Sequence, residues 1–287
     1  MEGGDGTRTT YGYDARHRLR SLVKRTAAGA LLLAMSYDVD ATGMRTAVEE
    51  SDASGLVRSV VYTYDATKRL TSEVIDHRDG SRDRSSTWTY DRVGNRLTQS
   101  ITTATGTAAT AYTYNANDHL TEETTDGTTT AYAYDANGST LAKGTGLDLT
   151  EYRYDDARRL IEAVTPEGTT TYVYDADGLR VRTTHVPSGG AATTTYHLQD
   201  RSYAYAQVVE EDVQEGTSPR RLAATYTFAD DLVSQTRYDE AATPTTHFVQ
   251  MDGFGSTRWL TDAAGVVTDT IDYDAFGNEI GRSGSTE

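Results

Sequence analysis

Tyrosine recurs at a regular interval along this chain, and that interval constrains the fold more than any other feature. From Tyr13 to Tyr174 the steps between Tyr-Asp or Tyr-Asn dipeptides are 24, 27, 26, 24, 20, 20 and 20 residues. Repeats of this length are typical of arrays of one supersecondary unit. The ten markers begin at Tyr13, Tyr37, Tyr64, Tyr90, Tyr114, Tyr134, Tyr154, Tyr174, Tyr238 and Tyr273.

A second aromatic residue usually stands two positions before the marker, as Tyr62 stands before Tyr64 and Trp88 before Tyr90. A period of two places both rings on the same face of an extended strand. Only 46 of the 287 residues are Leu, Ile, Val or Phe, whereas 20 are Tyr. We therefore expect the tyrosines to supply the apolar area that aliphatic residues do not.

A turn follows each marker, and the turns take two alternating forms. One form has a basic residue or His followed by Leu at marker +6, as in Arg69-Leu70. The other form has glycine at marker +4, namely at Gly94, Gly138, Gly178 and Gly277. We expect positive φ at these glycines and not at their counterparts Lys68, Asp118 and Arg158, so that the two forms occupy separate edges of the array. The turn after Tyr37 is expected to be irregular, because its Gly43 is displaced.

A second turn divides each unit near its middle, as at Ser54-Gly55 and Asp126-Gly127. Glycine after a small or acidic residue between β-prone runs predicts a hairpin. Lys24-Arg25 and the apolar run up to Met35 keep this spacing, so we predict a hairpin there and not a targeting segment. The fold class is therefore all-β, with stacked antiparallel β-hairpins that bury their faces against one another.

These units resemble the YD repeat of the Rhs family, which includes teneurins, wall-associated proteins and the shell subunits of Tc-type toxins. The resemblance rests on units such as 62–70 and 172–181, and on the ordered motifs Asp252-Gly-Phe-Gly-Ser-Thr-Arg-Trp-Leu and Tyr273-Asp-Ala-Phe-Gly-Asn. It covers nearly the whole chain and is strongest for the late part of an Rhs core. It implies a spiral sheet around a hollow interior, forming a shell or barrel that encloses a C-terminal toxin-like polypeptide or presents an adhesion surface.

The sequence ends at Glu287, before the Arg-Tyr-Tyr-Asp-Pro-like segment with which family members close the shell and self-cleave. We therefore assign no self-cleavage residues and expect an open or partial shell. Three regions are predicted from the regularity of the repeat: a hairpin array over 1–188, an irregular β segment with a long polar loop over 189–246, and Rhs-core-like terminal hairpins over 247–287. The resemblance implies a secreted or cell-surface protein.

Composition excludes several classes of function. There is no cysteine, so disulfides and thiolate metal sites are excluded. The net charge of -16 argues against nucleic acid and anionic membrane surfaces as partners, because both require basic residues. No apolar run is long enough for a membrane-spanning helix. The expected partner is a polypeptide, either cargo or the remainder of a parent protein.

No motif selects a catalytic, cofactor-binding or metal site, and we predict a protein that is not an enzyme. The histidines lack metal-ligand spacing. Asp175-Ala-Asp-Gly178 lacks the later ligands of a calcium loop and is interpreted as an Asx turn. Gly253-Phe-Gly255 precedes an expected strand and not the helix that a phosphate loop requires. The leading hypothesis is a non-catalytic scaffold, and the alternative is an extracellular adhesion module that binds carbohydrate or protein.

Overall fold

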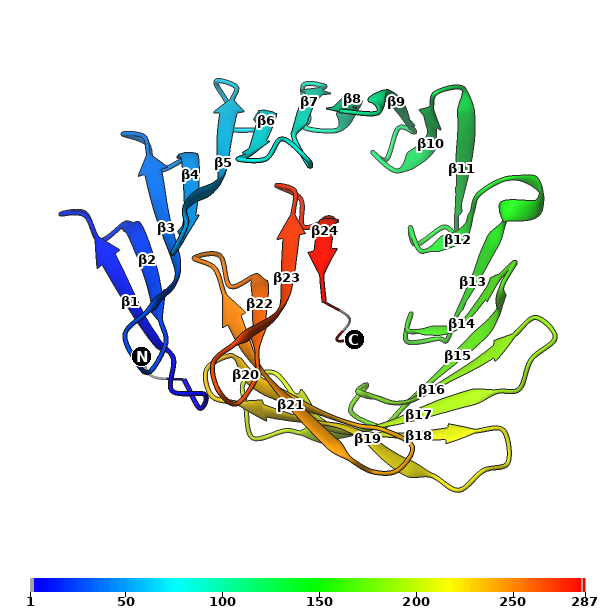
Figure 1. Cartoon of the computed structure of the whole chain (residues 1–287). Coiled ribbons are helices and arrows are strands. Elements are labelled where there is room, and N and C mark those ends of the chain that lie inside the picture. Colours follow the sequence, from blue (N-terminus) through cyan, green and yellow to red (C-terminus); the bar gives the residue numbers. More distant parts are fainter. Residues whose placement is uncertain (1–2, 285, 287) are drawn as a thin grey trace. The chain divides into compact units, whose positions relative to one another are not determined.

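The computed structural model describes residues 3–284 and 286, and it consists of β-hairpins (Figure 1). Its 24 strands form one antiparallel sheet in which strands that follow one another along the chain pair, as β1 pairs with β2 and β2 with β3. The prediction of an all-β array of antiparallel hairpins is confirmed. The described part of the chain contains no helix that could cross a membrane.

The first nine strands are β1 (Arg8–Tyr13), β2 (Leu19–Arg25), β3 (Leu31–Val39), β4 (Arg45–Asp52), β5 (Gly55–Tyr64), β6 (Leu70–His77), β7 (Arg84–Tyr90), β8 (Arg96–Thr103) and β9 (Gly106–Tyr114). Next come β10 (Leu120–Thr125), β11 (Thr128–Tyr134), β12 (Thr140–Lys143), the 3-10 turn η1 (Gly146–Asp148), β13 (Thr150–Tyr154), β14 (Leu160–Thr165), β15 (Gly168–Tyr174) and β16 (Arg180–Pro187). The last are β17 (Thr193–Asp200), β18 (Gln207–Glu215), β19 (Arg221–Phe228), β20 (Leu232–Tyr238), β21 (Pro244–Met251), β22 (Thr257–Thr261), β23 (Val267–Tyr273) and β24 (Glu279–Ser283).

The aspartate of a Tyr-Asp pair builds the turn that follows it in all units except the one marked by Tyr37. In the turn after Tyr64, the Asp65 carboxylate accepts hydrogen bonds from the backbone N–H groups of Thr67 and Arg69, at 2.8 and 3.0 Å. The Lys68 N–H donates to the Asp65 carbonyl at 3.0 Å. The same pattern recurs at Asp175, which confirms the predicted Asx turn. Aspartate suits this position because its side chain satisfies backbone donors that the turn leaves unpaired, and Asn115 does the same in the turn after Tyr114.

The tyrosine of the pair ties its strand to the preceding one. The Tyr90 hydroxyl donates to the carbonyl of Leu70, the first residue of β6, at 2.7 Å. Tyr134 and Tyr174 repeat this bond to Leu120 and Leu160, the first residues of β10 and β14. These markers, together with Tyr64 and Tyr154, therefore each tie a strand to the one before it.

The predicted difference between the two turn forms is wrong. The glycines do have positive φ, at 106° for Gly94, 86° for Gly138, 83° for Gly178 and 84° for Gly277. However, Lys68, Asp118 and Arg158 also have positive φ, at 68°, 60° and 60°. Both forms are the same three-residue turn with one left-handed residue, a position that Lys, Asp and Arg occupy here at a cost in strain.

The two forms also lie side by side on one edge, so the predicted separate edges are wrong as well. Arg69 pairs with the aspartate of its own turn, Nε to Asp65 Oδ2 at 2.7 Å, and its Nη1 donates to the Asp91 carbonyl of the next turn. Arg18 and Arg159 do the same toward Asp40 and Asp175. Arginine in one form thus bridges to the glycine form beside it, which accounts for the alternation.

Exchanging the left-handed residues is expected to change stability in opposite directions. Lys68→Gly should raise the free energy of unfolding by up to about 1 kcal/mol. Glycine removes the strain of positive φ, and the greater conformational entropy of the unfolded chain offsets only part of this gain. Gly94→Lys should lower that free energy by about 1 kcal/mol, although nothing lies within 4 Å of the added Cβ. Thermal denaturation of both variants tests this; a loss of stability in Lys68→Gly would contradict it.

Two further expectations require correction. The turn after Tyr37 is regular but is built on Asp40, because β3 continues for two residues beyond the marker.

The polar stretch 210–219, predicted to be a long loop, lies mostly in β18, and the segment 189–246 holds the four strands β17–β20. Its Glu, Asp and Gln residues occupy strand positions because their partners lie across the ladder, as the Glu211 carboxylate accepts from Tyr226. The run from Lys24 to Met35 forms the predicted hairpin.

The chain contains two compact units, Met1–Ala111 with Thr246–Glu287 (unit 1) and Tyr112–Thr245 (unit 2). In unit 2 the buried hydrophobic residues of the described chain are Ala163 and Ala224, and threonine pairs such as Thr124–Thr129 line its ladders. The three regions predicted from repeat regularity follow different boundaries and remain a description of the sequence.

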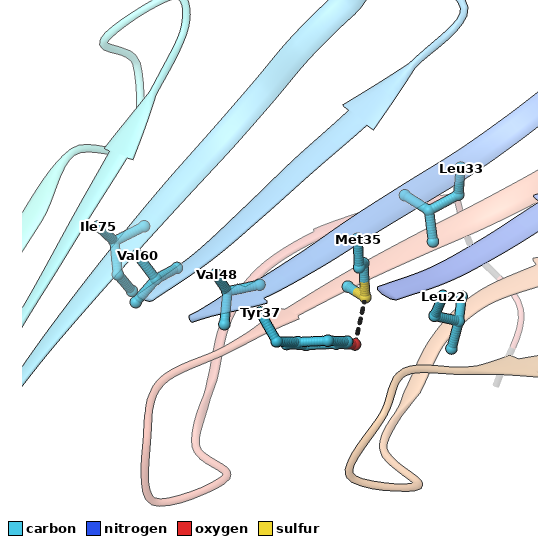
Figure 2. Packing of buried hydrophobic residues seen from close by; sticks show 7 residues of the cluster. All are labelled: Leu22, Leu33, Met35, Tyr37, Val48, Val60 and Ile75. Carbon is cyan, nitrogen blue, oxygen red and sulfur yellow. Dashed lines mark hydrogen bonds between the residues drawn. The ribbon is translucent and has the colours of Figure 1, made fainter. Parts of the chain in front are cut away.

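Unit 1 holds the large hydrophobic core (Figure 2). Its buried residues come from β2–β6 and are Leu22, Leu33, Met35, Tyr37, Val48, Val60 and Ile75. Trp259 of β22 and Ile280 of β24 pack against them, so the terminal hairpins cover this face. Tyr37 is the marker tyrosine in this core, whereas Tyr13 is 60 % exposed and Tyr134 is half-buried. The expectation that tyrosines replace aliphatic residues as core formers is therefore wrong for unit 1.

Candidate functional site

Buried charges join the terminal hairpins to the first hairpins of unit 1. Glu50 on β4 and Arg258 on β22 are 4 % exposed each, although 208 residues separate them in sequence. Their pairing is bidentate, with Arg258 Nη1 to Glu50 Oε1 at 2.8 Å and Nη2 to Oε2 at 3.2 Å. Two parallel charge-assisted hydrogen bonds fix both distance and orientation.

Arg58 and Asp272 extend this pair into a network. Arg58 on β5 donates to Glu50 through Nη2, and its Nη1 lies 3.2 Å from Asp272 Oδ1 on β23. Arg258 Nη2 donates to the same oxygen at 2.8 Å, and Arg82 Nη1 to Asp272 Oδ2 at 2.6 Å. Burial opposes ionisation of Asp272, but Arg58, Arg258 and Arg82 outweigh it and hold the pKa of that carboxyl below its ordinary value.

A second polar cluster joins β2 to β21 and β22. Lys24 Nζ donates to Gln250 Oε1 at 3.0 Å, and Gln250 Nε2 donates to Asp5 Oδ2 at 3.2 Å. The Thr261 hydroxyl also donates to Asp5 Oδ2, at 2.5 Å. Burial lowers the pKa of Lys24 to about 8, although the charges of Asp5 and Asp252 partly oppose this shift. The terminal hairpins are therefore positioned by directional polar contacts as well as by apolar packing.

Two turns of the terminal hairpins each carry a partly exposed phenylalanine two residues after their aspartate. Phe254 lies against Arg45, whose guanidinium carbon is 3.5 Å from the ring centroid and 4.2 Å from that of Tyr37. Phe276 meets Trp88 edge to face at 5.0 Å between centroids, and Arg96 lies 4.2 Å from its centroid. The Gly253 N–H donates to the Tyr37 hydroxyl at 3.0 Å. The motifs Asp252-Gly-Phe-Gly and Asp274-Ala-Phe-Gly thus dock these turns.

Glu73 on β6 faces the last of these turns from a fully buried position. Its side chain is 1 % exposed and accepts a hydrogen bond from the Ala275 N–H, while its Oε2 has no hydrogen-bond partner in the described chain. Burial raises the pKa of Glu73 to about 7, with Asp274 adding to the rise and Arg84 and Arg58 opposing it. An ionised Glu73 therefore works against docking of the β23–β24 hairpin.

The unfolding free energy is expected to depend on pH through Glu73. Its folded pKa lies above the ordinary value of 4.5, so the stabilising proton is fully bound below pH 4.5 and is lost as pH rises toward 7. Glu73→Gln, which cannot ionise, should remove a pH-dependent loss of up to about 3 kcal/mol between pH 4.5 and 8. Urea denaturation at several pH values measures this. Equal pH profiles for the two proteins would contradict it.

The sequence-predicted markers and these residues play different parts. Except for Tyr37, each marker tyrosine is the last residue of a strand, and the marker glycines lie in the turns that follow. Tyr37, Tyr273 and Gly277 also line the cavity between the first and the terminal hairpins. The repeat pattern does not reveal Glu50, Arg58, Glu73 or Asp272. A signal for the first three was present, because each stands two residues from a core aliphatic residue and so shares its face of the strand.

The arrangement offers ion pairing and shape complementarity and lacks an assembled centre for a metal. Among the described residues, no group of three His, Asp or Glu side chains could hold a metal ion. The buried carboxylates are paired with arginines or hydrogen-bonded to backbone N–H groups. The region therefore has the chemistry of an interface between hairpins.

Comparison with known proteins identifies relatives by family and by fold. The family model described as teneurin YD-shell matches residues 5–286. No curated protein matches. A chain in the crystal structure of TcdB2-TccC3 superposes with a TM-score of 0.77 at 16 % identity, over 99 % of this chain and 16 % of that chain. A chain in the crystal structure of TcdB2-TccC3-Cdc42 gives a TM-score of 0.70 at 16 % identity, over 99 % and 15 %. The present chain thus spans about a sixth of the length of these structures.

Proposed function

The chain belongs to the teneurin YD-shell family, and we propose that it is a non-catalytic wall segment that holds polypeptide against its hairpins. One observation carries this proposal: in unit 1, the face of β2–β6 already binds four later strands of the same chain. It does so through an apolar core and a buried ion network. A surface of this kind suits polypeptide because hairpins supply both the apolar side chains and the charged partners that it needs.

The family and the similar structures support the same proposal. Members of the Rhs family are expected to enclose a C-terminal toxin-like polypeptide, and the similar crystal structures carry the names of two or three polypeptides. We propose the corresponding role here, with cargo or the remainder of a parent protein as partner and a secreted or cell-surface location. The acidic net charge of -16 agrees with a protein partner and not with nucleic acid.

Protection from proteolysis tests this function. An unstructured, protease-sensitive segment is fused after Glu287, and the same segment is fused before Met1 as the matched control. We expect cleavage of the C-terminal fusion to be slower by about ten-fold, because polypeptide held against the wall is accessible only in rare open states. Equal cleavage rates for the two fusions would refute the proposal.

A further inference from the structure

A cavity of about 270 Å³ lies in unit 1 between β3–β5 and the two phenylalanine turns of the terminal hairpins. Its wall combines core aliphatic residues with Tyr62 and Tyr273. Its charged residues are three arginines and three carboxylates, namely Arg45, Arg58, Arg258, Glu50, Asp252 and Asp274. Ligand pockets usually measure about 300–1,000 Å³, so this cavity suits a single small ring and not an oligomer.

Arg45 presents an unused hydrogen-bonding edge to this cavity. Its guanidinium lies close to the rings of Tyr37 and Phe254, with its central carbon 4.2 and 3.5 Å from the two centroids. Throughout the described chain, no carboxylate forms an ion pair with Arg45, and its side chain donates no hydrogen bond. An arginine held by aromatic rings is pre-organised, so little side-chain entropy remains to be lost when its planar fork binds a carboxylate.

Other groups at the cavity also have unused hydrogen-bonding capacity. Arg58 is 4 % exposed, and its Nη groups face Glu50 and Asp272, but its Nε has no hydrogen-bond partner among the described residues. Asp252 Oδ2 lies 3.7 Å from Arg258 Nη1, which is beyond hydrogen-bond distance. The cavity therefore presents charged donors and a carboxylate acceptor within one small space, which favours a ligand that has both an anionic group and hydroxyl groups.

We propose that this cavity binds a sugar acid of the hexuronate class. The carboxylate of such a ligand would pair with the Arg45 fork, and a ring hydroxyl would donate to Asp252. The C–H face of the sugar ring would pack on the tyrosine rings. A neutral sugar leaves Arg45 unpaired, and a simple carboxylic acid leaves Asp252 without its donor. The binding of a small ligand is independent of whether the wall holds polypeptide.

Ligand-observed NMR with the full chain tests the proposal, using D-glucuronate as the probe. For a ligand of this size we expect a Kd of about 1 mM. D-glucose lacks the carboxylate, and cyclohexanecarboxylate lacks the hydroxyl groups; both should bind about ten-fold more weakly. Equal binding of glucose would overturn the role of Arg45. Equal binding of cyclohexanecarboxylate would overturn the sugar-acid assignment, as would the absence of glucuronate binding.

Matched variants distinguish the loss of the Arg45 contact from a general loss of folding. Arg45→Gln should weaken glucuronate binding about ten-fold, whereas Arg180→Gln, which alters an arginine placed over the Tyr172 ring in unit 2, should leave it unchanged. Circular dichroism establishes that each variant folds. Should Arg45→Gln not fold, Arg45→Lys keeps the charge but loses the bidentate fork, and it should weaken binding to a similar extent. Unchanged binding in the Arg45 variant that folds would overturn the proposal.

Discussion

Glu50→Gln is expected to lower the free energy of unfolding by about 3–5 kcal/mol, the usual cost of breaking a buried ion pair from one side. Glutamine keeps the volume of the side chain but removes the charge that Arg58 and Arg258 share. Both arginines are at most 5 % exposed, so water cannot replace the lost partner. Urea denaturation of the purified chain measures the change.

Glu49→Gln is the matched control for this experiment. Glu49 precedes Glu50 on β4, points to the opposite face and is exposed, with its Oε2 3.5 Å from the Ser36 hydroxyl. Its replacement should change the unfolding free energy by no more than about 0.5 kcal/mol. A comparable loss in the two variants would show that charge alone, and not the buried network, determines the effect.

Tyr37→Ala is expected to cost about 3–5 kcal/mol, as truncation of a fully buried aromatic residue does. Tyr37 is 2 % exposed, and its hydroxyl accepts the Gly253 N–H and donates to the Met35 sulfur at 3.1 Å (Figure 2). The substitution removes a contact between the first hairpins and the turn that follows β21, so it should also loosen the terminal hairpins.

Tyr134→Ala provides the comparison within the repeat. Tyr134 is half-buried in unit 2, and its hydroxyl donates to the Leu120 carbonyl at 2.8 Å. We expect a cost of about 1–2 kcal/mol, from one hydrogen bond and partial loss of apolar contact. Thermal denaturation of the two variants tests the contrast. Equal losses would mean that all marker tyrosines contribute alike, contrary to their burial.

The local architecture could be predicted from sequence because the same strand and turn patterns occur in many successive units. Alternating aromatic residues predicted the strands, and glycines such as Gly94 predicted the left-handed turn positions. The alternation of turn types was misread, because a positive φ is also open to Lys68 and Arg158 when an aspartate side chain supports the turn.

The docking of the terminal hairpins could not be predicted from local rules, because it depends on contacts between residues about 200 positions apart. The motif around Phe254 and Phe276 was recognised as belonging to the family, but the sequence did not show that its rings meet Arg45 and Trp88. Buried charges such as Glu50 could be recognised in the sequence, because they alternate with apolar residues on the buried face of a strand. Their partners required the structure.

A double-mutant cycle between Glu50 and Arg258 measures whether buried charges hold the terminal hairpins on the first hairpins. The unfolding free energies of Glu50→Gln, Arg258→Met and the double variant are compared with that of the parent chain. We predict a coupling of about 2–3 kcal/mol, because the two side chains form a bidentate pair in a buried place. Effects that add to within about 0.5 kcal/mol would show that the two residues do not interact, and that buried charges do not hold the terminal hairpins in place.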